Sequence, residues 1–326
     1  MQKKYSFPKI FINSILIVSA ATLITACSKP TENSNDQKSS SAQAETQQTR
    51  QVTDALGRSV TIPAQPQRVV VLSELDLDGA IALGIQPVGS SYVRGQSNFP
   101  DYLKDQTQNI TSVGSFGQPS MEQILSLQPD LIIAGSMIDQ QLINQLQQIA
   151  PTAVSFSRGE SWKDSFIKIG ELLNKQDLTQ KALKDYDEFT QQAREKLKAQ
   201  QGQTVSVVRW TANGPVTMLN DSFASLVLKD LGLTRPTYQQ EPGASHTPPI
   251  SRERFDQIDA DWLIIGSHLS SQKQLDQIKD LPEFKRLNAV KNNQYFVVDA
   301  SMWTGVGGPN AARQAINNVL EHIAKK

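Results

Sequence analysis

The chain has 326 residues, and its 32 basic side chains balance its 32 acidic ones, so the formal net charge at pH 7 is zero. Because no run of basic residues interrupts this balance, we exclude nucleic acid as a partner. Cys27 is the only cysteine, so the chain can form no internal disulfide and has no thiolate chemistry beyond this position.

The first 27 residues have the order of a secretory signal. Three lysines precede a mostly apolar stretch from Ile10 to Ala26, which is interrupted by polar residues. This stretch falls short of the roughly 20 apolar residues that a membrane-spanning helix needs. We therefore predict an export signal at residues 1–27.

The signal ends in Ile24-Thr25-Ala26-Cys27, which resembles the lipobox of bacterial lipoproteins. The resemblance implies cleavage before Cys27 and acylation of that residue, and the acyl chains would hold the protein at a membrane surface. Residues 28–50 are rich in Ser, Gln, Thr, Asn and Ala. Such a segment buries too little apolar surface to offset its ordering entropy, so we expect a flexible tether there.

Strands and helices alternate along the rest of the chain. In the first half we predict a buried strand at 69–72, a helix at 76–83 that ends at Gly84, and a strand at 152–156. Elements of the same kinds are predicted in the second half at 205–209, 216–219, 222–231, 295–298 and 309–324. Strands separated by helices indicate mostly parallel sheets.

One segment recurs 131 residues downstream. Residues 120–136 (SMEQILSLQPDLIIAGS) align without gaps to residues 251–267 (SRERFDQIDADWLIIGS). In each copy a serine suited to cap a helix precedes apolar residues at helical spacing, and a continuous apolar run then suits a strand buried on both faces. Two such copies predict two similar α/β lobes.

A long helical stretch, 177–199, lies between the copies. Asp177-Leu-Thr-Gln180 resembles a capping box, and apolar residues keep helical spacing along one face. At 1.5 Å per residue such a helix would extend about 34 Å. We expect it to connect the two lobes.

The segments at 52–63, 66–72, 113–114, 118–122 and 129–133 together resemble the opening and first-lobe signature of class III periplasmic binding proteins. These proteins serve ferric siderophores, haem and cobalamin. The chain is also similar to their ferric-siderophore branch at several later segments: 232–236, 258–261, 303, 307–309 and 311–312.

The resemblance implies an α/β fold with two Rossmann-like lobes joined by a single long helix, and a ligand held in the cleft between them. The stiff helix implies limited hinge motion. The divisions that we expect are the signal at 1–27, the tether at 28–50, an N-terminal lobe at 51–160, a helical connector at 161–202 and a C-terminal lobe at 203–326.

The family also implies one permease-docking glutamate on each lobe, and the resemblance carries this role onto Glu122 and Glu253. These residues occupy matching positions in the two repeated segments. A glutamate in the first turn of a helix also complements the helix dipole without any partner. Both interpretations stay open at this point.

In open α/β sheets, ligands bind beyond the carboxyl ends of the strands. A siderophore already surrounds its iron with oxygens, so the protein needs no metal ligands, only groups for the outer surface of the complex. Arginine offers a planar set of donors, and Trp and Tyr cover an apolar rim. The predicted ligand-binding residues are Arg94, Arg209, Trp210, Trp303, Tyr92, Arg158, His246 and His268.

One departure from the family concerns the ligand. Several hydroxamate and citrate-type relatives place an arginine just after the Val-Gly of the first-lobe signature, where this chain has Ser115-Phe116-Gly117. The missing guanidinium argues against a strongly anionic ligand. We therefore expect a hydroxamate or mixed siderophore.

Together these features predict an extracytoplasmic substrate-binding lipoprotein of an iron(III)–siderophore ABC transporter. We expect a monomer whose partners are the ferric siderophore, the permease subunits and, through the lipid anchor, a bacterial membrane. No cofactor and no metal ligands are expected.

Three alternatives are weighed against this prediction. Haem or cobalamin would suit the same fold, with His246 or His268 as an axial ligand. A direct-metal protein needs converging ligands, and the three histidines are scattered. An enzyme that uses the interlobe cleft is disfavoured because the sequence lacks a nucleophile elbow, a phosphate loop and a His-Glu-x-x-His motif.

Overall fold

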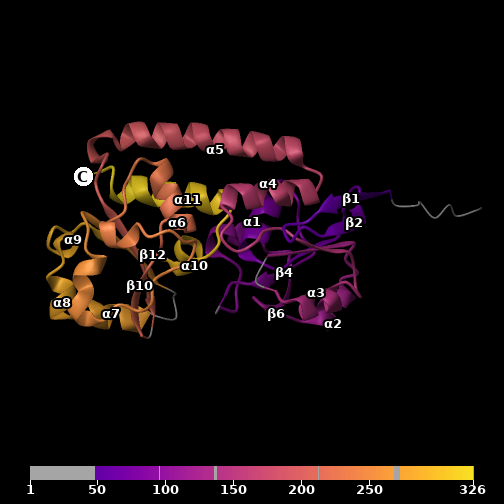
Figure 1. The fold of residues 1–326 in the computed structure, drawn as a ribbon, viewed down its shortest axis with the longest axis horizontal. Coiled ribbons are helices and arrows are strands. Elements are labelled where there is room, and N and C mark those ends of the chain that lie inside the picture. The colour runs from indigo at the N-terminus through magenta and orange to yellow at the C-terminus, as the bar shows by residue number, and fades with distance from the viewer. Residues whose placement is uncertain (1–47, 95, 136–137, 212, 268–271, 326) are drawn as a thin grey trace, which may run out of the picture. The chain divides into compact units, whose positions relative to one another are not determined.

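Two large β-sheets, one from each half of the sequence, and a separate two-stranded sheet lie in the part of the chain that the structure describes (Figure 1). This computed structural model describes residues 48–94, 96–135, 138–211, 213–267 and 272–325. All of them belong to one compact unit that begins at Thr46. The predicted export signal with Cys27, nearly all of the predicted tether, and His268 lie outside the described residues.

The first sheet has the strand order β6-β5-β4-β3-β7-β8, and all neighbours are parallel except β5 and β6. Its strands are β3 (Val69–Val71), β4 (Gly89–Tyr92), β5 (Thr111–Ser115), β6 (Gln118–Pro119), β7 (Leu131–Ala134) and β8 (Thr152–Val154). Every residue of β3, β7 and β8 is buried, as expected for parallel strands covered on both faces. An antiparallel hairpin precedes this sheet and consists of β1 (Thr49–Thr53) and β2 (Ser59–Pro63).

The second sheet has the order β10-β9-β11-β12, in which β9, β11 and β12 are parallel and β10 is antiparallel to β9. Its strands are β9 (Val205–Thr211), β10 (Gly214–Thr217), β11 (Trp262–Ser267) and β12 (Tyr295–Asp299). The predicted α/β class with mostly parallel sheets is confirmed.

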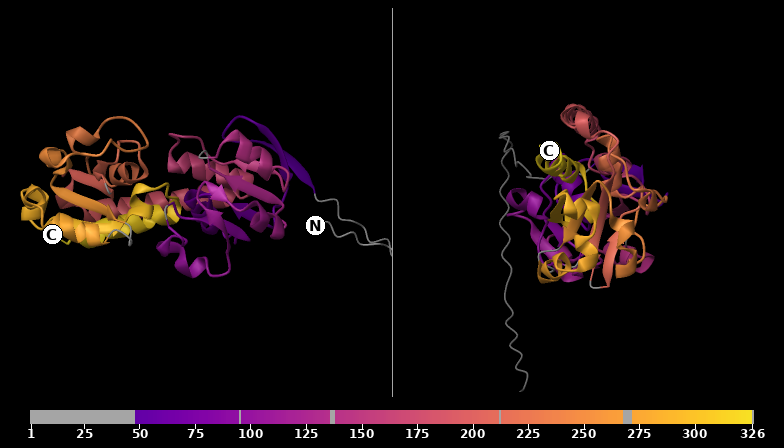
Figure 2. Two further views of the ribbon diagram at one scale, coloured as in Figure 1. Left: turned by 90° about the horizontal axis from the view of Figure 1, so that it is seen from below. Right: turned by 90° about the vertical axis from the view of Figure 1, so that its left-hand side faces the viewer.

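Helices pack around both sheets (Figures 1 and 2). The α-helices are α1 (Glu74–Ala82), α2 (Met121–Ser126), α3 (Gln140–Leu146), α4 (Trp162–Leu172), α5 (Gln176–Lys196), α6 (Phe223–Asp230), α7 (Gln272–Lys279), α8 (Pro282–Lys285), α9 (Asn288–Lys291), α10 (Ala300–Thr304) and α11 (Pro309–His322). Short 3-10 helices are η1 (Asp101–Gln106), η2 (Lys198–Gln200), η3 (Thr237–Gln239) and η4 (Arg252–Ile258). Within the described residues, no helix is long and apolar enough to span a bilayer.

The repeated segments occupy equivalent places in the two sheets. Strand β7 of the first copy lies beside β3, and β11 of the second copy lies beside β9. Asp130 accepts the backbone N–H of Arg68, just before β3, at 3.0 Å. Its counterpart Asp261 accepts that of Thr204, just before β9, at 2.7 Å. The repeat therefore marks two lobes, the N-terminal lobe around the first sheet and the C-terminal lobe around the second.

A hydrophobic core continues from one lobe into the other through the helices. Helix α5 packs against α4 and α11. One cluster of buried residues includes Phe166 of α4, Tyr186 of α5 and Ile316 of α11, as well as strand residues of both sheets. The Trp162 ring packs edge-on against Tyr186, with ring centroids 4.9 Å apart. The chain thus passes from one lobe to the other through the long helix α5, as predicted, and a shared helical layer also packs the lobes together.

Two local predictions at helix starts are wrong. Helix α5 begins at Gln176, without a side-chain cap, so Asp177 lies in its first turn and not in a capping box. Ser120 caps α2 as predicted, but Ser251 makes no such cap, and its segment folds as the kinked 3-10 helix η4. In this second copy the Ser251 hydroxyl bonds the Glu253 carboxylate instead.

Candidate ligand-binding site

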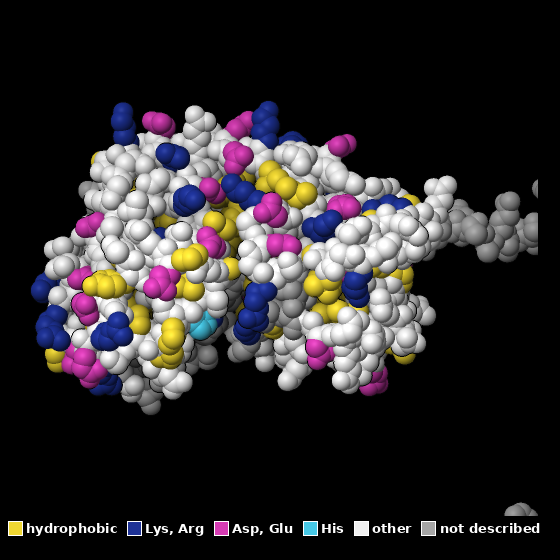
Figure 3. All heavy atoms as spheres, viewed as in Figure 1, with side chains coloured by type: hydrophobic (Ala, Val, Ile, Leu, Met, Phe, Trp, Pro, Cys, Tyr) yellow, Lys and Arg dark blue, Asp and Glu magenta, His cyan; other side chains and the backbone are white. Residues whose placement is uncertain are grey.

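Loops at the carboxyl ends of the parallel strands place charged side chains from both lobes near one another. Glu74 follows β3 and Arg94 follows β4 in the first sheet, while Arg209 lies in β9 and Asp299 ends β12 in the second. The charge of Asp299 acts on Glu74, and the charge of Arg94 acts on Arg209. The carboxyl edges of the two sheets therefore face each other, and Figure 3 shows the surface hollowed where the lobes meet.

Glu74 fixes the start of the loop that carries Arg94. Its carboxylate accepts the backbone N–H of Arg94 at 2.9 Å, and its side chain is buried at the first position of α1. Burial raises the pKa of the Glu74 carboxyl, and the negative charge of Asp299 raises it further, while the N–H and the charge of Arg94 oppose the shift.

The Arg94 guanidinium is exposed and lies over the ring of Phe116, 4.3 Å from its centroid. Phe116 lies between β5 and β6, in the segment where the sequence lacks the family's arginine. Because β4 pairs with β5, a residue that follows β4 can reach this loop. The structure thus places the Arg94 guanidinium beside the loop that lacks the family's arginine. This guanidinium comes from the segment that follows the neighbouring strand β4.

Arg209 is half-buried in the C-terminal lobe. Burial lowers the pKa of its guanidinium, and the like charge of Arg94 lowers it further. The next residue, Trp210, is 8% exposed and packs edge-on against Phe255, with centroids 5.7 Å apart. Since neighbouring strand residues point to opposite faces, Trp210 belongs mainly to the packing of its lobe.

The other predicted ligand-binding residues lie in separate parts of the structure. Tyr92 is half-buried against Phe99, with centroids 5.2 Å apart. Arg158 is exposed after the edge strand β8, three places from β4 in the sheet. The Nδ1 atom of His246 lies 2.8 Å from the carbonyl oxygen of Thr247. His268 lies outside the described residues.

Trp303 does not line a surface. Its side chain is fully buried in the shared core, and its indole Nε1 donates to Asn318 Oδ1 at 3.2 Å. Helix α10 places this ring in the interior of the C-terminal lobe, so we leave Trp303 out of the ligand site. Sequence reasoning missed Asp299. The available signal was its position directly after the apolar run at 295–298, which marks the carboxyl end of a strand.

The two proposed docking glutamates are both exposed. Glu122 lies in the first turn of α2, and Glu253 lies in η4. The pKa of Glu253 lies below its ordinary value because its own backbone N–H and the Ser251 hydroxyl bond the carboxylate. The charge of each glutamate is therefore available at the surface.

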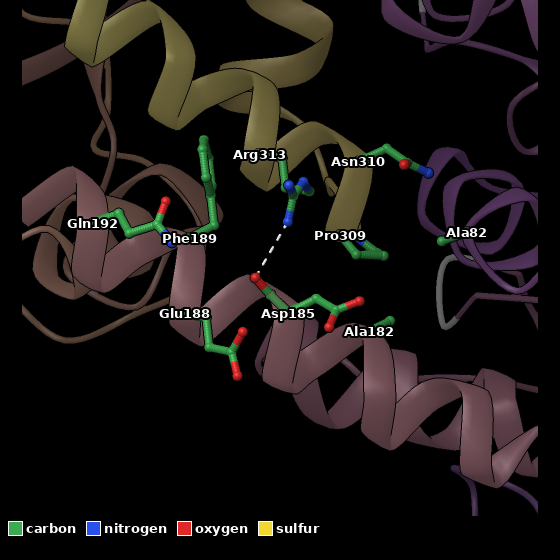
Figure 4. Close-up of a pocket in the computed structure, with 9 residues that line it drawn as sticks. All are labelled: Ala82, Ala182, Asp185, Glu188, Phe189, Gln192, Pro309, Asn310 and Arg313. Atoms are coloured by element: carbon green, nitrogen blue, oxygen red, sulfur yellow. Dashed lines mark hydrogen bonds between the residues drawn. The ribbon is translucent and has the colours of Figure 1, made fainter.

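Two surface pockets lie away from the carboxyl ends of the parallel strands. One, of about 420 Å³, is formed by residues of α1, α5 and α11, where Arg313 donates to the Asp185 carbonyl at 3.3 Å (Figure 4). The other, of about 610 Å³, includes β2, α3 and the amino end of β8. Among the described residues, no group of three or more His, Cys, Asp or Glu side chains could hold a metal ion.

Two α/β lobes that present charged loops to each other, joined by a shared helical layer, define a solute-binding protein. The family model described as "Periplasmic binding protein" matches residues 69–302, and the chain belongs to this family. The family and the relatives found are binding proteins.

Similar proteins cover nearly the whole chain. The "probable siderophore-binding lipoprotein YfiY" of Bacillus subtilis is 31% identical over 335 residues, which cover 100% of this chain and 99% of that protein. The "Fe(3+)-citrate-binding protein YfmC" of the same organism is 29% identical and covers 99% of this chain and 100% of that protein. The structure of Staphylococcus aureus SirA complexed with staphyloferrin B has a TM-score of 0.74 and 27% identity over 84% of this chain and 98% of that one.

Proposed function

We propose that this chain is the extracytoplasmic substrate-binding lipoprotein of an iron(III)–siderophore ABC transporter. It captures the ferric siderophore between the N-terminal lobe, residues 51–160, and the C-terminal lobe, residues 203–326. The observation that carries the proposal is a fold of two parallel-stranded lobes, with Arg94 just after β4 of one sheet and Arg209 near the carboxyl end of β9 in the other. The names of two full-length relatives, a probable siderophore-binding lipoprotein and an Fe(3+)-citrate-binding protein, support it.

In this account the protein acts by contact with the outside of a finished chelate. Because the siderophore occupies the coordination sites of iron, the protein supplies hydrogen-bond donors and apolar contacts, not metal ligands. Arg94, Arg209 and Tyr92, near the carboxyl ends of β4 and β9, are the proposed contacts, and Trp210 packs against Phe255 within the C-terminal lobe. Cys27 carries the lipid that keeps the protein at the membrane, and the mature chain acts as a monomer.

Delivery requires a surface that meets the permease, and Glu122 and Glu253 are proposed for it. Leu125, next to Glu122 on α2, is 60% exposed and offers an apolar contact beside the charge. At the matching position of the second copy the chain has Asp256. The two docking surfaces would thus share a glutamate but differ in their neighbours.

A titration tests the proposed function. The chain, purified in detergent, should change its tryptophan fluorescence saturably when ferric siderophores are added, because Trp210 adjoins Arg209 in sequence. Saturation by free ferric ion, with no response to any ferric chelate, would contradict the proposal. Saturation by haem, with a Soret shift, would favour the haem alternative instead.

A further inference from the structure

We infer that the site is built for an anionic ferric chelate with carboxylate oxygens on its outer surface, held by Arg94 of the N-terminal lobe and Arg209 of the C-terminal lobe. This inference rests on the proposed function and narrows its ligand. It differs from the hydroxamate or mixed siderophore that the sequence led us to expect.

Arg209 has no partner for its charge among the residues that the structure describes. Among the described residues, none forms a hydrogen bond or an ion pair with the Arg209 guanidinium, although it is half-buried. Other shielded arginines donate hydrogen bonds within the described part of the protein, although the Nε atom of Arg235 has no partner there. Arg58 donates to Asp54 at 2.9 and 2.5 Å, and Arg235 donates to the carbonyl oxygens of Val205 and Met218. Shielding a cation from water without such partners is unfavourable, and an anionic ligand would supply them.

The acidic residues near the two arginines are engaged in other hydrogen bonds. Glu74 accepts the backbone N–H of Arg94 at 2.9 Å, and no bond from the guanidinium. Asp299 caps α10, where it accepts the backbone N–H of Ser301 at 2.9 Å and the Ser301 hydroxyl at 2.7 Å. The positive charge of the two guanidiniums is therefore not cancelled by direct pairing within the described part of the protein.

Arg94 also has donors to offer. Its guanidinium carbon lies over the Phe116 ring, 4.3 Å from the ring centroid. Among the described residues, none accepts a hydrogen bond from this guanidinium, so its N–H donors stay available. Edge-on N–H pairs match the two oxygens of a carboxylate, and such bidentate pairs are among the strongest polar contacts in proteins.

Two like charges that approach from opposite lobes repel each other when the site is empty. A ligand that carries carboxylates neutralises both positive charges and accepts hydrogen bonds from both guanidiniums, so it removes this repulsion. Hydroxamate complexes that are neutral or cationic offer no such compensation. The arginine pair therefore selects by charge as well as by shape.

Competing ligands test this selection. We expect ferric dicitrate to bind the full chain at least tenfold more tightly than ferrioxamine B, a cationic hydroxamate complex, when both are measured by isothermal titration calorimetry. The affinity for ferric dicitrate should fall as salt is raised, because the contact is electrostatic.

Substitutions then locate the contacts. Arg94→Gln and Arg209→Gln should each weaken ferric dicitrate binding at least tenfold. Arg209→Lys keeps the charge but loses the planar donors, so its affinity for ferric dicitrate should lie between that of the glutamine variants and that of the unaltered chain. The exposed Arg286 of the C-terminal lobe gives the control Arg286→Gln, which should bind as before. Thermal melting of each variant separates lost binding from lost folding, and the exposed position of Arg94 makes that variant the safer test.

The outcomes separate this inference from the proposed function. Tight binding of ferrioxamine B but not of ferric dicitrate would overturn the inference and leave the siderophore function standing. Preference for an iron tris-catecholate over ferric dicitrate, or dicitrate binding that neither glutamine variant weakens, would also overturn it. Failure of every ferric chelate to bind would overturn both.

Discussion

Asp76 and Asp78 stand two residues apart on α1, and both carboxyl groups are fully buried. Asp76 accepts hydrogen bonds from the hydroxyl groups of Ser73, at 2.6 Å, and Ser155. Burial raises the pKa of Asp76 to about 6, although the two hydroxyl donors oppose the shift. Asp78 also has a pKa raised to about 6 by burial. At the residue scale, these two groups predict a pH-dependent stability.

The sign follows from the direction of the shift. A carboxyl whose pKa is raised in the folded state stabilises the protein most below its ordinary pKa of 3.8, and this contribution is lost as the pH rises through about 6. Relative to Asp76→Asn, the unaltered chain should therefore lose up to about 3 kcal/mol of unfolding free energy between pH 3.5 and pH 7.5. Urea unfolding at the two pH values measures this. A difference between the two proteins that does not vary with pH would contradict the assignment to Asp76.

At the scale of single elements, one helix of the C-terminal lobe begins on a residue of the N-terminal lobe. The Asp78 carboxylate accepts the backbone N–H groups of Asn310 and Ala311, each at 2.9 Å, at the start of α11. The Tyr102 hydroxyl bonds the same carboxylate. A Cβ on Gly308 would lie 2.7 Å from the Asp78 carboxyl carbon, so the absence of a side chain there lets the carboxylate reach the helix.

This cap between the lobes should contribute more to the free energy of unfolding than a helix cap within one lobe. Asp78→Ala leaves two backbone donors and a tyrosine hydroxyl without their buried acceptor, and we expect it to lower the free energy of unfolding by about 2–4 kcal/mol. The control is Asp139→Ala, because Asp139 caps the exposed start of α3 within one lobe, at 2.7 Å from the Leu142 nitrogen. That variant should lose only about 1 kcal/mol. Equal losses in urea unfolding would argue against a special role for Asp78.

The elements also show where sequence reasoning succeeds. The repeated apolar runs predicted β7 and β11, because a continuous apolar strand is recognisable without its neighbours. The start of α5 was missed because the chain turns at Asn174, whose φ of 55° only a few residue types adopt readily. The cap of the second copy was missed because Ser251 bonds Glu253, a choice that the alignment with Ser120 does not reveal.

The same distinction holds for the site. Arg94 and Arg209 were predictable because Arg94 lies just after β4 and Arg209 lies near the carboxyl end of β9, where the fold class places ligands. The burial of Trp303 was not, since it depends on how α10 packs beneath α11 and β11. The contact between Arg94 and Phe116 joins two loops that only the pairing of β4 with β5 brings together. Contacts of this kind need the three-dimensional arrangement.

At the scale of the whole molecule, ligand capture and delivery should depend on different surfaces. Charge reversals Glu122→Arg and Glu253→Arg should leave the affinity for the ferric siderophore unchanged, because both residues lie outside the facing strand ends. Uptake of radioactive iron should fall at least tenfold in cells where this chain and its permease form the only route. Glu321 is exposed on α11, so Glu321→Arg provides the matched control. Normal uptake by both reversed variants would refute the docking role.

The central claim is that one ferric chelate is held by both lobes at once. The most direct measurement is a crystal structure of the chain with ferric dicitrate, in which anomalous scattering locates the iron. We predict iron between the carboxyl edges of the two sheets, with ligand oxygens within hydrogen-bonding distance of Arg94 and Arg209. Iron bound to one lobe alone, or coordinated directly by protein side chains, would contradict the account.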